Sequence, residues 1–300
     1  MPAKHESIDE LLELAYDSDS QEEIERIARK VLKLNPNHPE ALLLLSDTLD
    51  DSGEQLTLLS QAYEVAAKEL KEEIGDSEIE DLLESESGMV LAGIIQRMII
   101  PLSEIGKTEE AFKLAKELRE LDPENQIQSH SFYYCMLLKT KDFSHVLEET
   151  MKDSTRSLAW AWARFIAVFM LSGECSASHK NFWEAIQMGP DVPFYMFGKY
   201  EEPDEDTEED NEDFSLALLF SEHVVCNSEE LLAYVMSRVS LFGLLSNRIT
   251  KDEIDEYDAA IEIIIGSGLM DNYLKLLDEI DDEDYPDKTI IKMISRDLSC

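Results

Sequence analysis

Apolar positions recur every three or four residues along most of this chain, which is the spacing of one face of an α-helix. The stretch 106–125, GKTEEAFKLAKELRELDPEN, shows the pattern well, with three apolar residues on one face. Gly106 interrupts the chain before this helix, Thr108 is placed to cap it, and Pro123 ends it. No segment of five or more residues alternates apolar and polar positions, so the sequence predicts an all-α fold.

The same periodicity predicts a series of helix pairs, each joined by a short turn. Before residue 190 the expected pairs are 7–16 with 21–34, 39–49 with 55–74, 89–104 with 108–121, 126–140 with 143–152, and 157–171 with 176–188. After an acidic stretch the expected helices are 214–226, 229–245, 250–265, 269–280 and 287–298. Thr250 and Glu253 have the spacing of a capping box.

The spacing of glycine and proline indicates an internal repeat. Glycines stand at the predicted turns within pairs, at Gly53, Gly106 and Gly173. Prolines stand at the ends of pairs, at Pro36, Pro123 and Pro190. The last two glycines and the last two prolines are each 67 residues apart, about two periods of 34. In each set, the interval between the first two residues exceeds a whole number of 34-residue periods by 19 residues. We therefore expect the series to be expanded between residues 53 and 89.

This period makes residues 7–190 resemble the tetratricopeptide-repeat family. Trp162, Phe165, Ile166 and Phe169 stand where that family places Trp, Leu, Gly and Tyr. The segment 189–198, GPDVPFYMFG, is similar to a string that follows the last repeat in a group of uncharacterised bacterial members. The resemblance implies a solenoid over residues 1–190. Charge density and helical periodicity predict an acidic loop over 191–213 and C-terminal helices over 214–300 that cap or continue the array. The resemblance also implies a non-enzymatic protein-binding scaffold.

Acidic residues outnumber basic ones by 66 to 26, which gives a formal net charge of −40. This charge disfavours nucleic acid and anionic membranes as partners. Solubility and recruitment of a basic partner are both explanations for it. The segment 201–213 holds ten acidic residues in thirteen and predicts a disordered loop or a docking tail. A calcium loop is excluded because Glu209 stands where glycine is needed and Ser215 where a bidentate glutamate is needed.

The sequence holds no recognisable catalytic, cofactor or metal motif. Phosphate-binding glycine loops, zinc-protease strings and nucleophile elbows are all missing. We expect the histidines to be surface or boundary residues, and Cys135, Cys175 and Cys226 to be buried, reduced core residues, with Cys300 exposed at the end of the chain. The N-terminal segment has no apolar signal region and no apolar run is long enough to span a bilayer, so we expect a cytoplasmic protein without a cofactor.

The resemblance implies a partner-binding groove lined by the first helix of each pair. The residues expected to line it are Glu6, Asp9, Glu13, Leu43, Asp47, Gln96, Ile100, Glu104, Trp160, Ala163, Ala167 and Met170. Basic residues are almost missing from this set, which argues against the clamp with which some family members hold a terminal carboxylate. The groove would suit a basic or amphipathic helical partner, or the chain's own C-terminal helices, which would leave a structural or assembly role.

Overall fold

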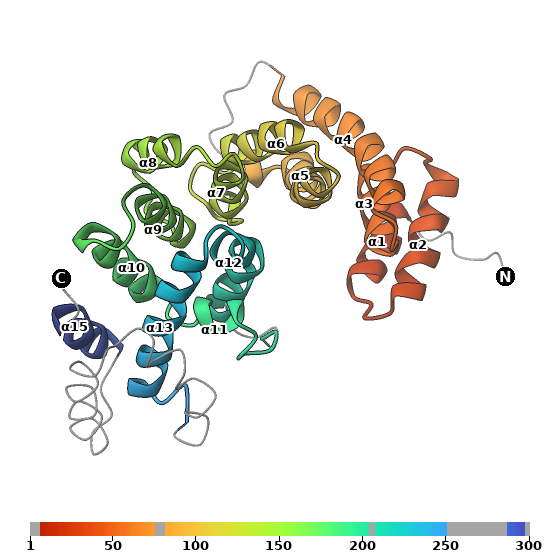
Figure 1. Ribbon diagram of the computed structural model, residues 1–300. Helices are drawn as coiled ribbons and strands as arrows, with labels where there is room; N and C mark the ends of the chain where they lie inside the picture. The colour runs from red at the N-terminus through yellow and green to blue at the C-terminus, as the bar shows by residue number, and fades with distance from the viewer. Residues whose placement is uncertain (1–6, 76–81, 204–207, 251–286, 298–300) are drawn as a thin grey trace. The chain divides into compact units, whose positions relative to one another are not determined.

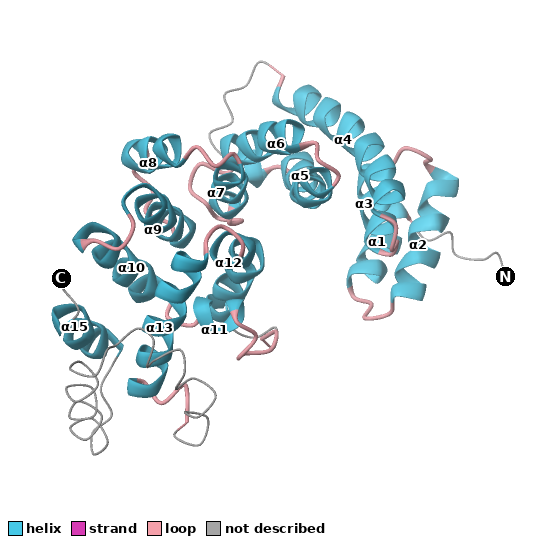
Figure 2. Cartoon of the chain, viewed as in Figure 1, coloured by secondary structure: helices cyan, strands magenta, loops and turns pink. Residues whose placement is uncertain are grey.

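Every described element of the chain is a helix, which confirms the predicted all-α fold (Figure 1, Figure 2). The computed structural model describes residues 7–75, 82–203, 208–250 and 287–297. It divides into two compact units, Met1–Met136 and Leu137–Cys300. Within the described residues, no helix combines the length and the apolar character that crossing a membrane requires.

The first unit is a series of helices. These are α1 (Ile8–Tyr16), α2 (Gln21–Leu34), α3 (Pro39–Asp47), α4 (Ser52–Ile74), the short 3₁₀ helix η1 (Leu82–Glu84), α5 (Glu86–Glu104), α6 (Thr108–Leu121) and the start of α7 (Ser129–Lys139). Successive α-helices from α1 to α6 pack against each other. The predicted bounds of α2 and α6 are confirmed. Within the segment where the expansion is predicted, α4 has 23 residues, nine more than the 14 of α2 and of α6.

Polar side chains at the helix ends explain several of these bounds. Ser7 and Glu10 form a capping box at α1, and Ser20, Asp51 and Ser85 accept backbone N–H bonds at the starts of α2, α4 and α5. The expected cap at Thr108 is wrong. Lys107 occupies the N-cap position of α6 without a side-chain bond, and Thr108 is the first helical residue.

The turns confirm two of the three expected turn glycines. Gly106 and Gly173 adopt positive φ angles of 83° and 66°, a region that favours glycine. Gly53 differs, because it lies inside the first turn of α4. The helix α7 also starts later than expected. Asp122 is fully buried and its carboxylate accepts the backbone N–H groups of Gln126, Ile127 and Ser129, which holds 122–128 as a loop.

The second unit is built around aromatic side chains. Its helices are α8 (Phe143–Lys152), α9 (Leu158–Ser172), α10 (Ser176–Met188), α11 (Val192–Met196), α12 (Glu208–Val225), α13 (Glu229–Leu245) and α15 (Asp287–Asp297). Phe165 of α9 contacts Phe182 of α10 and Tyr234 of α13, and Phe169 of α9 also contacts Tyr234, with ring centroids 4.9 to 5.9 Å apart. These edge and tilted contacts are the favoured geometries of aromatic pairs, so they fix how the three helices pack.

The segment expected to be an acidic loop is partly helical. The short helix α11 lies within it, and α12 begins at Glu208 where the predicted helix began at Phe214. Buried apolar residues explain the first difference, because Val192, Pro193 and Phe194 all lie in the core of the unit. The expected helices 250–265 and 269–280 lie almost entirely outside the described residues.

Candidate functional site

The groove residues expected in the first unit differ in exposure and in their partners. Asp9 and Glu13 are exposed on α1, whereas Leu43 is buried in α3. Asp47 forms an ion pair with Arg97 of α5 at 2.8 Å, and Gln96 donates to the carbonyl of Ile127. Exposed Glu104 and half-buried Ile100 lie on α5, and Glu6 lies outside the described residues. Several of these side chains therefore already have partners within the unit.

The groove residues expected in the second unit are mostly buried. Trp160, Ala163 and Ala167 of α9 have exposed fractions of 3%, 0% and 0%, and only Met170 is half-buried. The Trp160 indole donates its N–H to the carbonyl of Thr150 at 2.7 Å. The helix α9 also contacts α12 and α13 in addition to its neighbours α8 and α10. This face of α9 is thus covered by the unit's own helices.

A different hollow opens in the first unit, between the second helices of two successive pairs. We call it the α4–α6 groove; its volume is about 760 Å³. It lies over α5, which packs against both α4 and α6 (Figure 1). Its lining residues are Gly53, Leu56, Thr57, Ser60, Tyr63, Met98, Leu102, Ile105, Lys107, Glu110, Lys113, Leu114 and Glu117.

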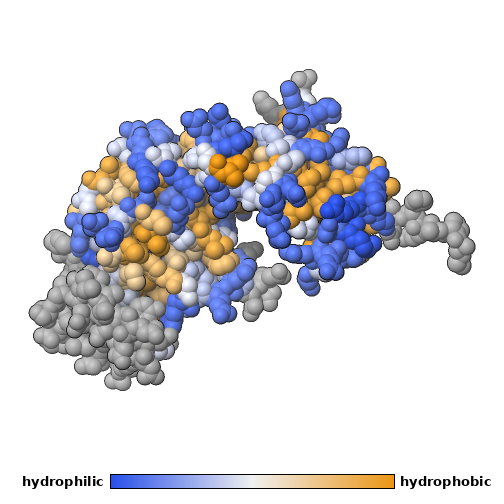
Figure 3. Space-filling view, turned by 45° about the vertical axis from the view of Figure 1, so that its right-hand side comes forward, coloured by the Kyte–Doolittle hydropathy of each residue, from blue (hydrophilic) through white to orange (hydrophobic). Residues whose placement is uncertain are grey.

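The α4–α6 groove has an apolar floor. Leu56, Met98 and Leu102 are buried beneath it, with exposed fractions of 6 to 8%. Leu114 is half-buried, and Ile105 keeps 53% of its surface exposed where α5 ends. Apolar patches also lie among hydrophilic residues on the molecular surface (Figure 3). An exposed isoleucine above an apolar floor is a feature of a surface that gains free energy when it is covered.

The rim of the groove is polar and carries both signs of charge. Lys107 forms an ion pair with Glu110 at 3.1 Å, and Lys113 and Glu117 stand further along α6. The Tyr63 hydroxyl of α4 donates to the Glu117 carboxylate of α6, with oxygen–oxygen distances of 2.8 and 2.9 Å. Burial, and then this bond to Glu117, raises the pKa of Tyr63 to about 12, so the hydroxyl stays protonated and links the two helices at neutral pH.

The titratable side chains of the groove are those of Tyr, Lys and Glu residues. Among the described residues that line it there is no His or Cys. Its two carboxylates are paired, Glu110 with Lys107 and Glu117 with Tyr63. In the described part of the chain, no group of His, Cys, Asp and Glu side chains is arranged to hold a metal ion.

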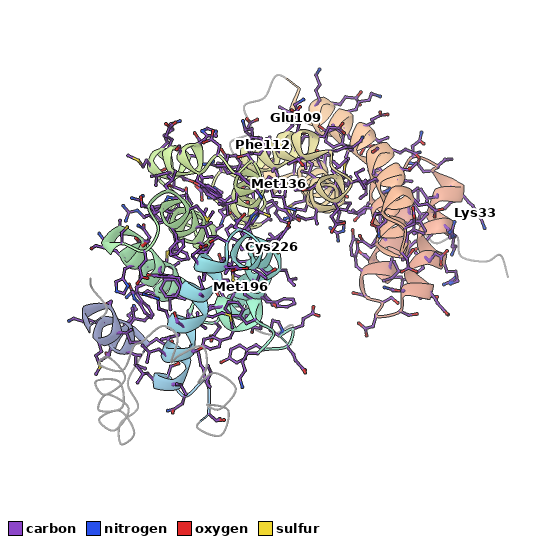
Figure 4. All side chains as sticks on the ribbon, in the orientation of Figure 1. Lys33, Glu109, Phe112, Met136, Met196 and Cys226 are labelled. Carbon is purple, nitrogen blue, oxygen red and sulfur yellow. The ribbon has the colours of Figure 1, made fainter. Side chains whose placement is uncertain are left out.

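The structure corrects the expected positions of several histidines and cysteines. His130, His179 and His223 are buried, not surface residues. Each stands three or four residues from a buried aromatic residue on its own helix, and this spacing was the signal that sequence reasoning missed. Cys135 is buried as expected, but Cys175 is half-buried and Cys226 is exposed just beyond α12 (Figure 4).

Sequence reasoning also missed the α4–α6 groove, because it assigned partner binding to the first helices of the pairs. The available signal was an apolar residue outside the core stripe. In α6 the buried stripe is Ala111, Ala115 and Leu118, and Leu114 falls beside it on the face that turns toward the groove.

Comparison with known proteins finds no matching family model, no matching curated protein and no matching solved structure. The resemblance to tetratricopeptide repeats therefore stays an expectation drawn from the sequence alone.

Proposed function

We propose that this protein is a non-enzymatic protein-interaction module, and that its α4–α6 groove binds an amphipathic helical segment of a partner. One observation carries the proposal, namely an open groove with an apolar floor and an exposed Ile105. A helix with its side chains is about 10 to 12 Å across, and peptides of this kind bind grooves between helices through apolar residues on one face.

The charges on the rim favour an amphipathic partner over a uniformly basic one. Lys107 and Lys113 stand beside Glu110 and Glu117, so the rim complements a helix that carries both signs of charge beside its apolar stripe. The net charge of −40 still raises the encounter rate with cationic partners at low ionic strength. Affinity would come mainly from the apolar floor and specificity from the rim.

A structural or assembly role is the second candidate. It is favoured by the burial of Trp160, Ala163 and Ala167, whose face of α9 is covered by helices of the same unit. In that case the second unit would act as a closed structural element, and partner binding would be restricted to the first.

Methyl NMR tests the groove directly. The methyl groups of Met98, Leu102, Ile105 and Leu114 are observed while a synthetic amphipathic peptide, with leucines at helical spacing and alternating lysine and glutamate elsewhere, is titrated into the labelled protein. We expect these methyl resonances to shift with one common dissociation constant. A scrambled peptide of the same composition has no apolar face and should leave them unchanged.

A matched pair of variants distinguishes binding in the groove from nonspecific binding to exposed apolar residues. Ile105→Glu places a charge on the floor, and we expect at least a tenfold loss of affinity. Leu34→Glu makes the same change at an apolar residue of α2 that is 57% exposed and lies outside the groove. Equal affinity losses in the two variants, or methyl shifts only elsewhere in the chain, would refute binding at this site.

A further inference from the structure

A second pocket, of about 730 Å³, lies between α10 and α15 in the second unit, where these helices pack together (Figure 1). We call it the α10–α15 pocket. Its lining residues are Ser176, His179, Lys180, Trp183, Glu184, Gln187, Lys288, Ile291, Lys292 and Ser295. It is separate from the α4–α6 groove and shares no residue with it.

The charge of this pocket is opposite to that of the chain. Three lysines, Lys180, Lys288 and Lys292, are exposed at its edge, against the single carboxylate of Glu184. None of the three forms an ion pair with another described residue. Carboxylates outnumber cationic side chains by 66 to 26 in this sequence. Three lysines without an ion-pair partner among the described residues therefore form a local basic site in an acidic protein.

Apolar residues lie between these lysines. Trp183 of α10 and Ile291 of α15 are 4% and 5% exposed and form part of the wall. On α15 the two lysines are four residues apart, so they stand one helical turn apart, with Ile291 between them in sequence. The pocket therefore combines exposed cationic side chains with an apolar part of its wall.

The pocket is fixed by contacts that do not involve the lysines. His179 donates from Nε2 to the carbonyl of Ser295 at 3.2 Å and accepts at Nδ1 from the Tyr234 hydroxyl at 3.4 Å. These bonds connect α10 to α15 and to α13. Burial lowers the pKa of His179, so the ring is neutral in this role and the positive charge of the pocket comes from the lysines.

We propose that the α10–α15 pocket binds an acidic segment of a partner protein, with its carboxylates at the three lysines and one apolar side chain against Trp183 and Ile291. This interaction goes beyond the proposed binding of an amphipathic helix in the first unit and does not depend on it. The partner chemistry differs too, because this site selects negative charge.

The type and arrangement of the cations favour a peptide over a compact anion such as phosphate. Arginine provides the bidentate geometry that phosphate recognition often uses, and no arginine lines this pocket in the described residues. Lysines on two helices match carboxylates distributed along a chain. The apolar wall also has no role in binding inorganic phosphate.

Fluorescence anisotropy with a labelled seven-residue peptide tests the site in the full-length protein. The peptide has leucine at its centre and three glutamates on each side. We expect saturable binding that weakens as salt is added, because exposed charges are screened. Replacing the leucine by serine should weaken binding about fivefold, through loss of apolar burial. Replacing all glutamates by lysine should abolish it.

Two triple variants provide the decisive comparison. In the first, Lys180, Lys288 and Lys292 are all replaced by glutamine, and we expect affinity to fall about tenfold or more. The second variant replaces the exposed Lys33, Lys71 and Lys116 of the first unit by glutamine as well. Lys33 is labelled on α2 in Figure 4. This variant makes the same change in net charge, and affinity should change less than twofold.

Circular dichroism of both variants should match that of the unchanged protein, because all six lysines are exposed. Equal losses in the two variants would show that only overall charge matters, and would overturn the proposal. Binding of inorganic phosphate in the same assay, without binding of the peptide, would overturn it as well.

Discussion

Asp213 is a buried carboxyl group whose removal should change how stability depends on pH. It lies on α12, is 8% exposed, and accepts the backbone N–H of Asp191 at 3.1 Å just before α11. Burial raises the pKa of Asp213 to about 7, although the N–H bonds of Asp191 and Val192 oppose the rise. Asp213→Asn keeps the shape and one acceptor oxygen but cannot titrate.

The sign and size of the effect follow from the two pKa values. The folded-state pKa of about 7 lies above the ordinary value of 3.8, so protonation stabilises the folded unit. This stabilisation is fully present below pH 3.8 and is lost as the pH rises through 7. With about 1.4 kcal/mol per pKa unit, the whole contribution is about 4 kcal/mol, of which about 2.6 kcal/mol is lost between pH 5 and pH 8.

Urea unfolding followed by tryptophan fluorescence measures this contribution in the second unit alone, because all three tryptophans lie there. Titration of the many other carboxylates affects both proteins equally. The wild-type free energy of unfolding should therefore fall by about 2 to 3 kcal/mol more than that of Asp213→Asn between pH 5 and pH 8. Glu230→Gln, at an exposed residue of α13, serves as the control and should follow the wild type. Parallel pH curves for wild type and Asp213→Asn would show that the buried carboxyl group is not the cause.

Two further substitutions test packing. Ala167→Leu should lower the free energy of unfolding of the second unit by about 1 to 3 kcal/mol, because Ala167 is fully buried; an unchanged urea midpoint would show that this face of α9 is open. Gly88→Ala should destabilise the first unit by about 2 kcal/mol or more, since an added Cβ would lie 1.9 Å from the Leu82 carbonyl oxygen. Gly93→Ala is the control on the same helix, because its added Cβ would meet only ordinary van der Waals contacts. It should stabilise the helix by about 0.5 to 1 kcal/mol, measured by thermal unfolding followed by circular dichroism. An unfolding midpoint that falls as far as that of Gly88→Ala would contradict the steric reasoning.

Helices were predictable from the sequence where local signals determined both ends. In α6 an apolar stripe and a proline just beyond it predict the bounds that the structure has, and Ser228 caps the start of α13 where the sequence predicts an Asn-Ser turn and cap. The start of α7 was not predictable in this way. It depends on the buried Asp122 carboxylate, whose bonds to three backbone N–H groups form only when the loop has folded around it.

Candidate sites were harder to predict than helices, since they depend on how helices pack. The position of Trp160, Ala163 and Ala167 in the helix pair predicts that they line a groove, whereas all three are buried in a helix that packs against α8, α10, α12 and α13. In the α10–α15 pocket, Lys180 on α10 is more than 100 residues away in sequence from Lys288 and Lys292 on α15. No local spacing could have brought them together.

The position of α15 explains how a basic pocket persists in so acidic a protein. Arg248 forms ion pairs with Asp287, the first residue of α15, at 2.8 Å, and with Asp191 at 2.7 Å. All three side chains are at most one-third exposed, so solvent screens these pairs less than it screens surface pairs. Asp287 directly precedes Lys288 in the sequence and has Arg248 as its own cation. The pairing of Arg248 therefore fixes the start of α15, the helix that carries two of the three lysines that we propose bind an acidic partner.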